Sequence, residues 1–110
     1  MSGGMRRLVL ETLDGAPDGL GGRAGGWTPK GEHWGRLEPR SASLDAGDGG
    51  PRSRARYRVV IRAVPVGAPS RPKPGDRFLD GARVLPIRGV LDADPMARHL
   101  ICFVDEEVRP

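Results

Sequence analysis

Glycine and proline recur so densely along this chain that they leave little room for long helices. The 110 residues include 17 glycines and 11 prolines. Glycine disfavours a helix because it is conformationally free, and proline because it lacks the backbone N–H and clashes with the preceding turn. These residues concentrate in Asp14–Gly26, Ala46–Pro51 and Pro65–Gly75. We therefore expect an all-β protein in which these stretches connect short strands.

Length and apolar content indicate one small domain, residues 1–110. Domains of this length are common. Only 37% of the residues are hydrophobic, so the core is expected to be thin. Cores of this size are often completed by partners. A subunit of an oligomer therefore fits the composition better than a self-sufficient monomer.

Alternating apolar and polar residues mark about six short strands. Asp80-Gly81 is a strong hairpin signal, and Asp94–Arg98 has the pattern of a single helical turn. His99–Val104 is apolar on both faces, which predicts a central strand. Together these elements predict a small antiparallel barrel or sandwich with long loops. The expected strands are Arg7–Leu13, Trp27–Pro39 (two short pieces around a bend), Tyr57–Arg62, Asp76–Leu79, Ala82–Leu85 (continued after Pro86 by Ile87–Leu91) and His99–Val104.

Two segments are expected to lack regular structure. In Arg40–Arg54 the only sizeable apolar side chain is Leu44, so this segment is interpreted as a long flexible loop. Residues 65–75 are proline-rich and predict an extended connection. Trp34, by contrast, is expected to be a buried apolar anchor of its strand.

The residue types needed for catalysis do not form a recognisable constellation. His33 and His99 are far apart and are interpreted as packed or surface histidines, and Asp105–Glu107 as a solvated end. Cys102 is alone, which excludes an internal disulfide and a cysteine-rich metal site, and it lies in an apolar run typical of a buried residue. We expect no enzyme activity, no cofactor and no metal. A membrane span and a signal peptide are not expected either, which predicts a soluble protein made in the cytoplasm.

Arginine carries most of the positive charge and is the strongest functional signal. The net charge is +4, and all 18 basic residues except Lys30 and Lys73 are arginine. A row of like charges on one strand face is stabilised by an anion, either nucleic acid backbone or acidic side chains. A solvated strand edge protected from aggregation explains the row equally well. Aromatic residues are only 5% of the chain, which disfavours base stacking, although a free-standing oligonucleotide-binding barrel stays an alternative function. The row comprises Arg52, Arg54, Arg56, Arg58 and Arg62.

The order of motifs resembles the head-tail joining family of long-tailed bacteriophages, also called head closure or stopper proteins. The version carried by gene transfer agents, phage-derived particles that package host DNA, is the most similar. The resemblance extends from about Leu8 to Glu107. It is carried by Asp18-Gly19-Leu20-Gly21-Gly22, Trp27, Trp34, Tyr57–Arg62, Asp76-Arg77-Phe78, Gly81-Ala82-Arg83-Val84 and a last strand that closes on Glu106.

The resemblance implies a structural protein of the particle neck, assembled in the bacterial cytoplasm. It implies a small β-barrel that forms a six-fold or twelve-fold homo-oligomeric ring. Portal and adaptor proteins would bind the ring on the head side, and tail terminator or tail-tube proteins on the tail side, with packaged double-stranded DNA in the channel. The 40–54 segment would gate the channel, through Ser41, Leu44, Asp45 and Asp48. The arginine row (Arg52, Arg54, Arg56, Arg58 and Arg62) would lie near the lumen or at a subunit boundary.

Overall fold

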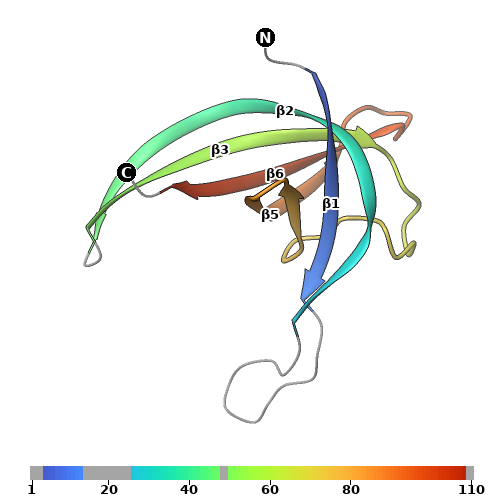
Figure 1. Ribbon diagram of the computed structural model, residues 1–110. Helices are drawn as coiled ribbons and strands as arrows, with labels where there is room; N and C mark the ends of the chain where they lie inside the picture. Colours follow the sequence, from blue (N-terminus) through green and yellow to red (C-terminus); the bar gives the residue numbers. More distant parts are fainter. Residues whose placement is uncertain (1–3, 14–25, 48–49, 109–110) are drawn as a thin grey trace.

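The computed structural model describes residues 4–13, 26–47 and 50–108, which form a closed antiparallel β-barrel of six strands (Figure 1). The order around the barrel is β1-β2-β3-β6-β5-β4, and β4 pairs with β1 to close it. The all-β prediction and the expected number of strands are confirmed, and the choice between barrel and sandwich is settled in favour of the barrel. The strands are β1 (Met5–Leu13), β2 (Trp27–Gly47), β3 (Gly50–Arg62), β4 (Arg77–Asp80), β5 (Arg83–Asp92) and β6 (His99–Val108).

The core is a single cluster of apolar side chains inside the barrel. Alternate residues of each strand point inward, as the pleat of a strand requires. Burial of each large side chain contributes about 1.5–3 kcal/mol relative to leaving it in water. Cys102 belongs to this cluster, as the sequence predicted. The buried residues are Leu8, Leu10, Val59, Ile61, Phe78, Leu85, Ile87, Leu100, Cys102 and Val104.

A long arm of paired strands replaces the loop expected over residues 40–54, and β6 also pairs with β3 as far as Ser53. β2 pairs with β1 only as far as Arg36 and then continues to Gly47 alongside β3. Beyond Arg36, β2 and β3 form an arm that extends away from the barrel (Figure 1). The prediction of an unstructured segment is therefore wrong for the described residues. The prediction was based only on how few apolar side chains this segment can bury. The segment is instead ordered by backbone hydrogen bonds between β2 and β3, and β3 in turn pairs with β6.

β2 is one continuous strand rather than the two expected pieces. The register with β1 shifts between Leu10 and Glu11, where Lys30 is an extra residue between the partners Pro29 and Gly31. Gly31 has a φ of 138°, which glycine adopts without strain. The interruption expected at Pro29 and Gly31 is therefore a β-bulge, and β2 stays paired with β1 on both sides of it.

The predictions for the C-terminal half are mostly confirmed. β4 and β5 form the hairpin at Asp80-Gly81, and their pairing ends at Pro86. β6 lies between β3 and β5, which is the expected central position. The 94–98 segment is a turn closed by a hydrogen bond from the Ala97 N–H to the Asp94 carbonyl oxygen, not a helical turn.

The proline-rich connection is fastened to one end of the barrel by a buried carboxylate. Asp76 is 3% exposed. Its carboxylate accepts hydrogen bonds from the Thr12 hydroxyl at 2.7 Å and from the Lys73 ammonium at 2.8 Å. Pro72 of the same connection is fully buried. The prediction of an extended connection is wrong in part, because the segment contains turns closed by backbone hydrogen bonds, as from the Ala68 N–H to the Pro65 carbonyl oxygen.

Candidate functional site

The arginine row lies on the outer face of β3. Val59 and Ile61 point into the core, so the residues that alternate with them point outward. Arg54, Arg56 and Arg58 therefore share one face, and Arg62 continues it at the end of the strand, as the sequence predicted. Arg52 also belongs to β3, but its side chain lies outside the described part of the structure.

Carboxylates of the neighbouring strands meet the middle of this row. The Arg58 Nε atom lies 3.5 Å from the Glu38 Oε1 atom on β2, and the Arg56 Nε atom lies 4.0 Å from the Asp105 Oδ1 atom on β6. Asp105 also binds Arg88, at 3.1 Å. The expectation that the acidic end of the chain is a solvated run is wrong for Asp105, whose side chain is 19% exposed. The sequence allowed either nucleic acid backbone or acidic side chains as partners for the row. In the structure, acidic side chains of the same chain lie near Arg56 and Arg58.

A second ion-pair cluster lies at the base of the arm. The Arg83 guanidinium donates two hydrogen bonds to the Glu106 carboxylate, each 2.8 Å long. It also stacks over the Tyr57 ring and contacts Asp80. The hydrogen bonds from Arg83 hold the pKa of Glu106 below its usual value. Sequence reasoning missed this cluster, because Arg83 and Glu106 meet only when β3, β5 and β6 are in register.

The Phe103 ring makes a cation–π contact with an arginine and does not pack in the core. It lies opposite Arg58 on the outer face of the sheet, and the Arg40 guanidinium stands 4.8 Å from the centre of its ring. Such a contact contributes about 0.5–1 kcal/mol at an exposed site. The outer face of β2, β3 and β6 is thus a mixed surface of arginines, carboxylates and one aromatic ring.

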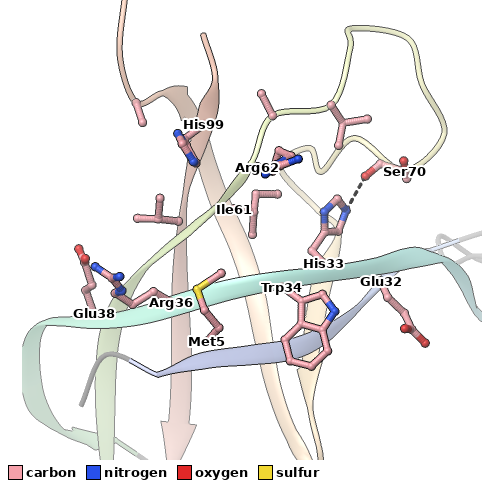
Figure 2. Close-up of a pocket in the computed structure, with 14 residues that line it drawn as sticks. Met5, Glu32, His33, Trp34, Arg36, Glu38, Ile61, Arg62, Ser70 and His99 are labelled. Atoms are coloured by element: carbon pink, nitrogen blue, oxygen red, sulfur yellow. Dashed lines mark hydrogen bonds between the residues drawn. The ribbon is translucent and has the colours of Figure 1, made fainter. Parts of the chain in front are cut away.

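A groove of about 770 Å³ opens at the other end of the same sheet (Figure 2). Figure 2 shows Trp34, Met5 and Arg36 on the side formed by β1 and β2, and Arg62 and His99 on the opposite side. Trp34 is 59% exposed, so the expectation that it is a buried anchor is wrong. Its neighbours in β2, His33 and Gly35, point inward, which leaves the indole on the outer face.

The histidines and the cysteine have structural surroundings. The His33 Nε2 atom lies 2.7 Å from the carbonyl oxygen of Ser70 and the ring packs edge-on against Phe78, whereas His99 is an exposed residue beside Asp94. Both were expected to be packed or surface histidines, which is confirmed. Burial raises the pKa of the Cys102 thiol to about 12. Within the described ranges, no group of three or more His, Cys, Asp or Glu side chains is placed to hold a metal ion, and no helix is long and apolar enough to cross a membrane.

The expected gating residues belong to the arm. Ser41 is exposed on β2, opposite Arg56 of β3. Leu44 and Asp45 lie further out on the same strand, where the structure describes the backbone alone. Asp48 lies outside the described residues, as does the glycine-rich Asp18–Gly22 stretch.

Comparison with known proteins gives a consistent result. A family model described as phage head completion protein matches residues 4–107. A chain in the solved structure titled "Virion of native gene transfer agent (GTA) particle" is 40% identical to this chain and superimposes on it with a TM-score of 0.87. That match covers 96% of each of the two chains. A comparison with curated proteins found no match.

Proposed function

Because this chain belongs to the family of phage head completion proteins, we propose that it is the stopper of a tailed phage or gene transfer agent particle. In this role it forms a ring between the portal and adaptor on the head side and the tail on the other. The ring closes the channel that holds the packaged DNA and gives the tail a surface on which to dock. The observation that carries the proposal is the likeness to the particle protein along nearly the whole chain.

A ring of identical subunits suits the energetics of this barrel. Its core consists of ten buried apolar side chains, and contacts between subunits would add to that small core. A head-to-tail contact that closes on itself generates such a ring, and six-fold or twelve-fold symmetry would match a phage neck. The mixed-charge outer face supports a place at a subunit boundary for the arginine row. Arg56 and Arg58 each lie near a carboxylate of their own chain, and this mixture of charges would suit a neighbouring subunit whose surface also carries both signs.

The β2–β3 arm is the proposed gate. It extends from the barrel beyond the last residue that β1 covers, so one edge of β2 from Leu37 onward has no neighbouring strand among the described elements. Because β3 pairs with β6 only as far as Ser53, the tip of the arm beyond that residue can change its angle without opening the core. Ser41, Leu44 and Asp45 lie on this arm, and they are the residues proposed to act in the channel, together with Asp48.

The alternative, a free-standing oligonucleotide-binding barrel, is not favoured by any contact in the described residues. A phosphate backbone on β3 would have to compete with Glu38 and Asp105 for Arg58 and Arg56. A salt titration of DNA binding by the isolated protein separates the two functions. Tight binding with a steep salt dependence would support the alternative. Weak binding would agree with the stopper.

The test is complementation of particles that lack this protein. We expect electron microscopy of such preparations to show filled heads without tails, or heads that have lost their DNA, and the wild-type chain to restore complete particles. Replacement of Arg54, Arg56 and Arg58 by alanine is expected to leave the fold intact and to lower the yield of complete particles. The matched variant with lysine at the same positions keeps the charge and is expected to retain most of the yield. Complete particles without the protein would refute the proposed function.

A further inference from the structure

Two arginines in the groove of Figure 2 have no ion-pair partner among the described residues. Most basic side chains in the described ranges contact a carboxylate, a carbonyl oxygen or an aromatic ring of the same chain. Arg36 and Arg62 do not, and both line the groove. Lys30 is the other such residue in that part of the chain, and it does not line the groove. Unpaired cations that share a groove indicate an anionic ligand.

Large apolar side chains lie beside these cations. Trp34 is 59% exposed and Met5 is 55% exposed. Met5 lies directly opposite Arg36 in the pairing of β1 with β2. Tryptophan, methionine and arginine are enriched where proteins bind one another, since they combine a large apolar surface with a polar group. The groove therefore suits a ligand that carries apolar side chains as well as negative charge.

The distribution of charge favours separate carboxylates over a continuous polyanion. Glu32 and Glu38 also line the groove, and they stay close to Arg7 and Arg58 respectively. The hydrogen bond from Arg7 lowers the pKa of Glu32, so this carboxylate stays charged. A DNA backbone would bring phosphates against both glutamates, and like charges placed together cost free energy. A peptide segment can place its carboxylates at Arg36 and Arg62 alone.

The described carboxylates of a second copy of this chain are poorly suited to occupy the groove. The described carboxylates are almost all held by basic groups of their own chain, as in the Asp80, Asp105 and Glu106 contacts. Asp92 has no such partner in the described ranges. However, it is adjacent to Ala93, which lines the same groove.

We infer that this groove binds an extended segment of a different particle protein, one that presents two carboxylates and an apolar side chain on the same face. The carboxylates pair with Arg36 and Arg62, and the apolar side chain covers Trp34 and Met5. The inference rests on the proposed function in one respect only, namely that the protein works in contact with other proteins of a particle. It assigns a role to the groove, which includes Arg62 from the end of the arginine row, apart from the other residues of that row and from the arm.

The first experiment uses a defined probe on the full-length protein. The peptide acetyl-Glu-Gly-Glu-Gly-Leu-amide, whose two glutamates and leucine share one face when it is extended, is titrated into the isotope-labelled protein and followed by NMR, alongside the same peptide with glutamine in place of glutamate and a short DNA duplex. The acidic peptide is expected to shift the indole N–H signal of Trp34, and the glutamine peptide is expected to leave it unchanged. A response to neither peptide would overturn the inference. A larger response to the duplex would also overturn it, because it would assign the groove to nucleic acid.

Matched double variants connect the response to the two arginines. Arg36→Gln with Arg62→Gln is expected to weaken peptide binding about tenfold or more, because each lost contact is a hydrogen bond to a charged group. Lys30→Gln with Arg88→Gln removes the same charge outside the groove and is expected to leave the affinity within about twofold, since distant charges are screened. Equal losses in both double variants would show a general charge effect and overturn the inference.

Cross-linking in assembled particles identifies the occupant. A benzophenone amino acid at position 34 is expected to cross-link to a peptide of another particle protein that contains two acidic residues within a few positions. Cross-links to a second copy of this chain would overturn the inference. This result is independent of the proposed stopper function, which fails only if complete particles form without the protein.

Discussion

Gly35 lies where three strands come closest together, and alanine at this position is expected to destabilise the barrel. A Cβ atom there would lie 2.9 Å from the Ile61 Cγ2 atom, 3.1 Å from the Val60 carbonyl oxygen and 3.2 Å from the Leu8 Cδ1 atom. Carbon atoms prefer a separation of about 3.5–4.0 Å. Leu8 is fully buried and Ile61 is 1% exposed, so both are packed against their neighbours. The Val60 carbonyl is part of the backbone of β3 and cannot rotate away.

The magnitude follows from two opposing effects. Insertion of extra carbon into a filled core costs about 1–3 kcal/mol. Replacement of glycine by alanine returns about 0.4–1 kcal/mol, since it restricts the unfolded chain. The net loss is about 1–2 kcal/mol, measured as the free energy of unfolding by urea with tryptophan fluorescence or circular dichroism.

Gly89→Ala is the matched control for this prediction. A Cβ atom at position 89 would meet only the Phe103 ring, at 3.7 Å, which is an ordinary contact. Its stability is therefore expected to equal that of the wild type or to rise slightly. The steric reasoning would be refuted if Gly35→Ala were as stable as the wild type, or if both variants lost the same free energy.

Three further predictions follow from burial and charge. Phe78→Ala should cost about 3–5 kcal/mol of unfolding free energy and Trp34→Ala less than about 1 kcal/mol, because Phe78 is fully buried and Trp34 is 59% exposed; equal costs in urea melts would contradict this. The lowered pKa of Glu106 contributes stability above the ordinary value of 4.5, and that contribution is lost as the pH falls through the lower value of the folded state. Glu106→Gln should therefore flatten the decline in stability below pH 4.5, and an unchanged decline would count against the ion pair with Arg83. The Cys102 thiol, with its pKa raised to about 12, should resist a thiol reagent at pH about 8 until urea unfolds the protein; equally fast reaction in the native state would contradict this burial.

The sequence predicted the elements whose signals are local. The Asp80-Gly81 hairpin was correct because the turn type depends on adjacent residues, and the central position of β6 followed from its two apolar faces. The alternation of the arginine row likewise placed its side chains on one face of β3. The burial of Cys102 could be inferred from its apolar neighbours.

The errors occurred where pairing between distant segments decides the structure. The arm has few apolar residues, and it is ordered by backbone pairing to β3 that its composition does not reveal. Trp34 was assigned to the core because it is large and apolar, but the register of β2 places His33 and Gly35 inside instead. The Arg83–Glu106 pair also depends on register, and no local signal marks it.

Electron cryo-microscopy of the particle neck is the measurement that tests the stopper function most directly. The six-stranded barrel should fit a closed ring of identical subunits at the junction of head and tail, with the β2–β3 arms directed at the channel. Density for this barrel at another place in the particle, or a complete junction without it, would contradict the proposed function.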